Sequence, residues 1–152
     1  MLPTPKRFSV VAGSGQGETR LTAFDRALLD AGIGNLNLIR VSSVLPPGCE
    51  YAPQIDLPPG SLVPTAYGAL ISDEPGEEIA AAIGVGLSPD SFGMIFEYAA
   101  KGTREQAEEA VAAMLREAFA SRGMQLQRSL IKGVERRVER VACVIAAAAL
   151  WY

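Results

Sequence analysis

The chain has 152 residues, no histidine, and a formal net charge of −3 from 14 basic and 17 acidic residues. This length suffices for one domain with a sizeable core. The densest basic run, at 132–140, is interleaved with glutamates, which argues against a nucleic-acid partner. Without histidine the usual general base and metal ligand are missing, and Cys49 and Cys143 have no spacing typical of a metal site.

Residues 7–13 are rich in β-branched side chains and end at glycine, which predicts a strand. A loop at 13–18 then leads into a predicted helix at 19–34, with Leu21, Phe24 and Leu28 at helical spacing. A second strand is predicted at 35–41.

Residues 45–64 contain six prolines, so we expect no regular element there, only an extended surface excursion within one domain. Three predicted strands follow, at 66–74, 77–88 and 91–100.

The clearest helix is predicted at 103–123, where Thr103 and Gln106 can form a capping box and Gly123 ends the helix. One or two further strands are expected in 128–150. This order predicts an α/β sandwich of antiparallel or mixed sheets.

The C-terminal run at 141–152 is apolar but shorter than the roughly 20 residues that a membrane-spanning helix needs. We therefore expect a buried strand or a subunit contact there, and no membrane partner. The N-terminal segment lacks the apolar core of a signal peptide, which favours a cytoplasmic protein.

A glycine-rich loop, GSGQG at 13–17, lies between the first predicted strand and helix. A dinucleotide-binding loop would need a third glycine where Glu18 stands, and a P-loop would need Gly-Lys-Ser or Gly-Lys-Thr. A carboxylate at the start of the helix would also repel a phosphate. We interpret the loop as a tight turn from strand to helix.

Two carboxylates and one amide are candidate site residues. Asp25 shares a helix face with Leu21 and Leu29, so it is either a solvated or paired acid or the wall of a pocket for a cation. Glu97 is either a solvated charge near a strand end or a carboxylic acid whose raised pKa suits proton donation. Asn37 lies in a strand, where it is either a structural amide or a donor to an oxyanion.

Ser42 and Ser43 stand between a predicted strand and the Pro46–Pro47 turn. Small turn-forming residues are common there, and a serine nucleophile usually needs a histidine base. Ser43 can instead attack the carbonyl of Ser42, because the chain itself holds the nucleophile beside its target. The resulting ester can eliminate to dehydroalanine and hydrolyse to a pyruvoyl group, which would break the chain between the two serines.

The segment AFDRALLDAGIGNLNLIRVSSVLPPG, at 23–48, closely resembles the pyruvoyl-dependent arginine decarboxylases, as do 7–25 and 93–111. The resemblance implies one αββα domain over 1–152. It also implies self-cleavage into a smaller chain, 1–42, and a larger chain, 43–152. Ser43 would become a covalent pyruvoyl cofactor, which replaces pyridoxal phosphate and needs no metal.

The resemblance further implies that the amine of L-arginine forms a Schiff base with the pyruvoyl group before CO2 leaves and agmatine remains. Asn37 matches an asparagine of self-processing, Glu97 a proton donor, and Asp25 the aspartate that meets the guanidinium group. Ser42 and Asp25 are the substrate-binding candidates.

The family assembles as trimers or larger homo-oligomers, with active sites between neighbouring subunits. This would make the alanine-rich strands contact surfaces. Two alternatives remain, namely an unprocessed silent subunit that binds a cationic small molecule and an interaction module that offers 45–64 as a polyproline ligand. The sequence leaves open whether agmatine would serve polyamine synthesis or acid resistance.

Overall fold

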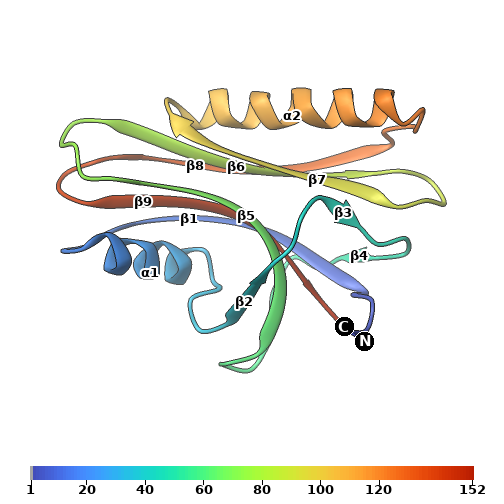
Figure 1. Cartoon of the computed structure of the whole chain (residues 1–152), viewed down its shortest axis with the longest axis horizontal. Helices are drawn as coiled ribbons and strands as arrows, with labels where there is room; N and C mark the ends of the chain where they lie inside the picture. The colour runs from blue at the N-terminus through green and yellow to red at the C-terminus, as the bar shows by residue number, and fades with distance from the viewer. Residues whose placement is uncertain (1) are drawn as a thin grey trace.

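The computed structural model describes residues 2–152 as two stacked β-sheets with a helix on each outer face (Figure 1). The strands are β1 (Arg7–Gln16), β2 (Asn37–Arg40), β3 (Val44–Leu45), β4 (Glu50–Tyr51), β5 (Leu62–Ser72), β6 (Glu78–Leu87), β7 (Gly93–Lys101), β8 (Arg128–Arg137) and β9 (Ala142–Trp151). The helices are α1 (Arg20–Asp30) and α2 (Arg104–Ser121). This arrangement confirms the predicted α/β sandwich.

The first sheet has the strand order β2-β5-β9-β1-β4, and the second has the order β3-β7-β6-β8. In the first sheet, β1–β4 and β2–β5 are parallel pairs, whereas β9 is antiparallel to both of its neighbours. The second sheet is antiparallel throughout. Of the two sheets, only the first is therefore mixed.

Both helices begin at a capping box, with Thr19 as the N-cap of α1 and Thr103 as the N-cap of α2. The predicted partner Gln106 is confirmed in the second box, where its Oε1 accepts from the N–H of Thr103 at 3.0 Å. The predicted first helix extends too far, because α1 ends at Asp30 and Gly32 follows with φ of +83°, a left-handed conformation that suits glycine.

The proline-rich segment is less irregular than predicted. The two-residue strands β3 and β4 touch or lie within it, and β5 begins at Leu62. Pro64 fits inside β5 because the pairing of β5 with β9 starts only at Thr65. Distant pairing partners create these short strands, so local composition gives little sign of them.

Small residues set the layer spacing. A Cβ at Gly13 of β1 would lie 2.5 Å from the backbone oxygen of Ala27, so only glycine lets α1 approach this closely. The buried residues of α1 are accordingly Ala23 and Ala27. Of the three apolar residues predicted at helical spacing, Leu21 does not pack inward, because it is 75% exposed.

The alanine-rich strands form the interior of this single chain. β9 is buried along its whole length, and nine of the ten residues of β6 are buried or nearly so, with Glu78 exposed. Of the two expectations for the apolar C-terminal run, the buried strand is confirmed, and the structure accounts for β9 without a subunit contact. No helix within residues 2–152 is long and apolar enough to cross a membrane.

Candidate active site

The chain crosses from the first sheet to the second at the serine pair, between β2 and β3 (Figure 1). On one side, the N–H of Val41 donates to the carbonyl of Thr65 on β5 at 3.1 Å. On the other, the N–H of Ile95 on β7 donates to the carbonyl of Ser43 at 2.7 Å. The peptide bond between Ser42 and Ser43 is therefore a short link whose two ends are each hydrogen-bonded to a different sheet.

Glu97 points from β7 into the layer between the sheets. Its neighbours on that face, Ile95 and Ala99, belong to the inter-sheet core, whereas Phe96 and Tyr98 pack toward α2. Alternation along β7 therefore puts Glu97 on the face that packs against the first sheet. The burial of Glu97 raises the pKa of its carboxyl group, because the charged form loses hydration.

Gly68 of β5 makes room for that carboxylate. A Cβ at Gly68 would lie 3.1 Å from Cβ and 3.2 Å from Cγ of Glu97. Any side chain at this position would compete with Glu97 for space. The inter-sheet faces of β5 and β7 thus bound the place where the carboxyl group lies, and Ser43 is hydrogen-bonded to β7 only two residues from Glu97.

Arg40, at the end of β2, is a site residue that was not among the candidates predicted from the sequence. Its Nη2 donates to the carbonyl of Tyr67 at 2.9 Å, and its guanidinium carbon lies 4.4 Å from the centroid of the Tyr67 ring. The positive charge of Arg40 lowers the pKa of Glu97 and so offsets part of the effect of burial. An arginine on the apolar face of a strand, two residues before Ser42, was the available signal.

Asn37 does not meet the serine pair within one chain. Its Nδ2 donates to the carbonyl of Gly60 at 3.0 Å, in the turn that precedes β5. Because β2 runs extended at roughly 3.3 Å per residue, it carries this amide away from Ser42. The role of Asn37 as a hydrogen-bond donor to an oxyanion therefore stays a prediction, and it requires a contact other than the one to Gly60.

Asp25 lies on the exposed face of α1, between the exposed side chains of Leu21 and Leu29. Among residues 2–152, no hydrogen bond or ion pair engages its carboxylate. The structure therefore leaves Asp25 available to a molecule outside this chain and does not place it beside Ser43.

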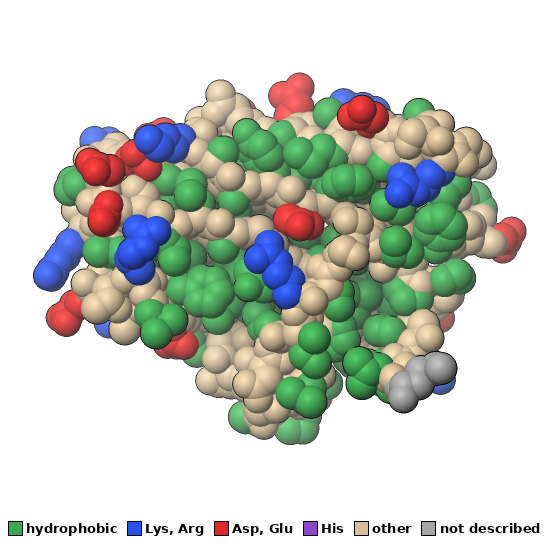
Figure 2. Space-filling model, in the orientation of Figure 1, with side chains coloured by type: hydrophobic (Ala, Val, Ile, Leu, Met, Phe, Trp, Pro, Cys, Tyr) green, Lys and Arg blue, Asp and Glu red, His purple; other side chains and the backbone are tan. Residues whose placement is uncertain are grey.

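Large apolar side chains are exposed around the crossing and on α1. Figure 2 shows hydrophobic side chains gathered over much of the corresponding face of the molecule. The exposed members near the crossing are Ile39, Val41, Val44 and Leu62. Such a concentration is typical of a surface that another protein molecule covers.

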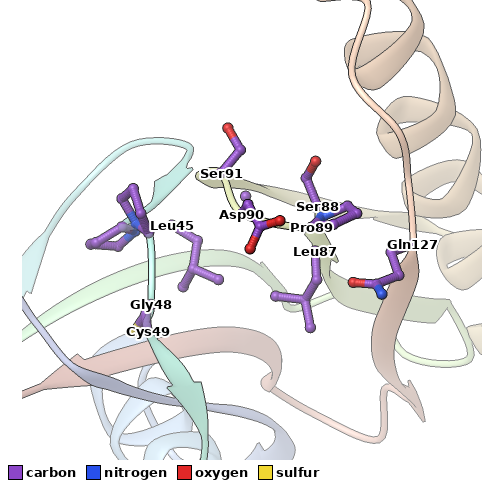
Figure 3. A pocket seen from close by; sticks show the side chains of 12 residues that line it. Leu45, Gly48, Cys49, Leu87, Ser88, Pro89, Asp90, Ser91 and Gln127 are labelled. Atoms are coloured by element: carbon purple, nitrogen blue, oxygen red, sulfur yellow. The ribbon is translucent and has the colours of Figure 1, made fainter.

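A hollow of about 660 Å³ lies beyond β3 (Figure 3). Leu45 and Cys49 line one wall, Leu87 and Gln127 line the other, and Asp90 lies between them. Burial and the nearby Glu50 raise the pKa of the Cys49 thiol to about 11, which keeps it protonated and unreactive at neutral pH. None of the predicted site residues lines this hollow, so the candidate site lies outside it.

A family model described as "Pyruvoyl-dependent arginine decarboxylase" matches residues 7–152. A protein of that name from Methanocaldococcus jannaschii is 53% identical, over 97% of this chain and 91% of its own length. Another, from Methanococcus vannielii, is 46% identical, over 97% and 92%. A third, from Pyrococcus abyssi, is 43% identical, over 97% and 96%.

Proposed function

We propose that this chain, which belongs to the pyruvoyl-dependent arginine decarboxylase family, converts L-arginine to agmatine and CO2. The reaction would use a pyruvoyl group made from Ser43. Agmatine would then be available for polyamine synthesis. The observation that carries the proposal is the serine link between the sheets, which lies next to the half-buried acid Glu97.

The local geometry suits self-cleavage. The hydrogen bonds of Val41 and Ser43 restrain both ends of the link, so the Ser43 hydroxyl stays close to the carbonyl carbon of Ser42. Restraint of this kind replaces part of the work of a general base. Ser43 is half-buried, which suits a residue that becomes a cofactor sheltered from solvent.

The cleaved chain would remain a single domain. The smaller fragment, 1–42, carries β1, α1 and β2, and the larger one, 43–152, carries the other elements. β1 pairs with β9 over ten residues, and β2 pairs with β5 over four. These ladders hold the fragments together without the peptide bond.

The pyruvoyl group supplies the carbonyl that accepts the electrons of the broken carbon–carboxylate bond. Glu97, whose pKa burial raises, would donate a proton to the carbon that has lost CO2. Asp25 pairs with the substrate guanidinium, because planar cations bind carboxylates strongly.

We assign Asp25 and Asn37 to sites completed by a neighbouring copy, in a homotrimer or a larger assembly. Within one chain neither contacts the serine pair, and Asp25 is flanked by exposed leucines that a second copy would cover. Ser42 belongs to the substrate-binding wall, since it ends the smaller fragment at the site.

The test is an intact-mass measurement of the purified 16.1 kDa chain together with an assay for agmatine. Wild type should split between Ser42 and Ser43, with a carbonyl at the start of the larger fragment. Ser43→Ala should stay whole and inactive, and Asn37→Ala should split slowly.

Ser121→Ala, on α2 and far from the crossing in the chain, is the matched control and should behave as wild type. An intact wild-type chain without activity would contradict the proposal and favour a silent subunit that binds a cationic small molecule.

A further inference from the structure

Arg40 is fixed by two contacts to one residue. It donates to the Tyr67 carbonyl at 2.9 Å and lies over the Tyr67 ring at 4.4 Å. A guanidinium group can stack on a ring and donate in its plane at the same time, which an ammonium group cannot do as well. Tyr67 is itself in contact with Phe24 of α1, with ring centroids 6.4 Å apart. The cation therefore has a defined place at the edge of β5.

Glu97 reaches the same part of β5 from the other sheet. Its Cβ and Cγ lie over Gly68, the residue after Tyr67. The guanidinium and the carboxyl group thus approach neighbouring residues of one strand from its two faces, because Tyr67 belongs to the α1 side and Glu97 to the inter-sheet layer.

The other groups near Glu97 are uncharged. The inter-sheet residues of the surrounding strands are Leu45 of β3, Ala66 and Leu70 of β5, Ile83 and Val85 of β6, and Val144, Ala146 and Ala148 of β9. The two nearby phenols face elsewhere, since Tyr67 lies on the α1 side and Tyr98 on the α2 side. Among residues 2–152, Arg40 is thus the charged group that acts on this carboxyl.

We propose that Arg40 is a positioning residue that, held on Tyr67, keeps a positive charge beside Glu97 and sets the pH range over which Glu97 gives up its proton. Burial raises the pKa of Glu97, and the nearby cation lowers it. After cleavage Arg40 would belong to the smaller fragment and Glu97 to the larger one, so the coupling would connect the two fragments.

The sign of the effect follows from the charges. Removing the cation leaves burial unopposed, so the pKa of Glu97 rises further. The consequence for catalysis rests on the proposed role of Glu97 as proton donor. The effect of the Arg40 charge on the pKa of Glu97 does not depend on that role. If the protonated acid is the active form, activity is lost as pH rises through its pKa, and without Arg40 that loss moves to higher pH.

The direct test is NMR of the cleaved protein with glutamates labelled at the side-chain carboxyl carbon. Glu97→Gln identifies the Glu97 signal by removing it. In Arg40→Met the signal should titrate at higher pH than in wild type, and Arg40→Gln, a neutral residue that can still donate to the Tyr67 carbonyl, should shift it in the same direction. In Arg40→Lys, which keeps the charge, it should stay near its wild-type position.

Arg122→Met is the matched control, because Arg122 also donates to a backbone carbonyl, that of Ala118, but lies at the end of α2. An unchanged or lowered titration pH in both neutral variants of Arg40 would overturn the inference. The pH profile of kcat/KM should move with the NMR titration. Full activity of Glu97→Gln would overturn its role as proton donor and leave the measured coupling to Arg40 intact.

Discussion

Gly68 lies so close to the Glu97 side chain that there is little space for even one additional carbon atom. In Gly68→Ala the new methyl carbon would lie 3.1 Å from Cβ and 3.2 Å from Cγ of Glu97, whereas ordinary contacts begin near 3.4 Å. It would also lie 3.5 Å from the backbone nitrogen of Tyr98, which is an acceptable distance. Rotation of the Glu97 side chain can relieve the contact with Cγ, but Cβ is fixed by the backbone, so β7 and β5 must also separate locally by a few tenths of an ångström.

The effect on stability should be small and the effect on activity large. Overpacking costs about 1 kcal/mol at its lower end, and replacing glycine by alanine returns about 0.4–1 kcal/mol through the unfolded state. The melting temperature should therefore change by no more than about 4 °C. Displacing a proton donor by a fraction of an ångström should lower kcat/KM about tenfold to a hundredfold.

The assay is agmatine formation by protein whose cleavage has been confirmed by mass, with thermal unfolding measured in parallel. Gly133→Ala is the matched control, since a Cβ there would lie 2.8 Å from Cγ of Glu108, on the α2 side of the second sheet. Gly133→Ala should keep its activity. Wild-type kcat/KM in Gly68→Ala, alongside an impaired Glu97→Gln, would refute the placement of Glu97 over Gly68.

Three further predictions concern other parts of the molecule. Asp25→Ala should raise KM for arginine roughly ten- to a hundredfold by removing a charge-assisted pair, with little change for an uncharged analogue; an unchanged KM would exclude the role. The pKa of Glu97 is higher in the folded than in the unfolded state, so folding stability should fall as pH rises between these two pKa values. Glu97→Gln should therefore melt at a higher temperature than wild type at pH values above both pKa values, and at the same temperature below both. Gly13→Ala should destabilise the fold by about 1–3 kcal/mol in urea unfolding, because the methyl would meet the backbone of α1 at 2.5 Å.

Local signals in the sequence predicted much of the architecture. The capping box of Thr103 and Gln106 lies within four residues, so its pattern alone locates the start of α2. Helical spacing placed Phe24 and Leu28 correctly but not Leu21, because the close packing of α1 depends on Gly13 in another element. Leu21 is more hydrophobic than Ala23 and Ala27, but only side chains as small as alanine fit between α1 and the glycines of β1.

In the candidate site too, some residues could be predicted from the local sequence and others could not. Adjacent serines carry their chemistry in the sequence itself, and Glu97 was a candidate because it is a carboxylate near the end of a predicted strand. Arg40 escaped prediction because its partner Tyr67 is 27 residues away and meets it only through the β2–β5 pairing. The Asn37 amide likewise has a partner, Gly60, that becomes its neighbour only in the folded sheet.

If the chain is cut at the serine link as proposed, maturation would be a one-way step, because the link is the covalent connection between strands of the two sheets. A chain that folds before it is cut assembles its strands at the high effective concentration of a single molecule. Once cut, the two fragments share only hydrogen bonds and packing, so denaturation would release them as separate molecules. Recovery from denaturation would then depend on protein concentration, and an enzyme that unfolds after maturation would be far harder to restore than its uncut precursor.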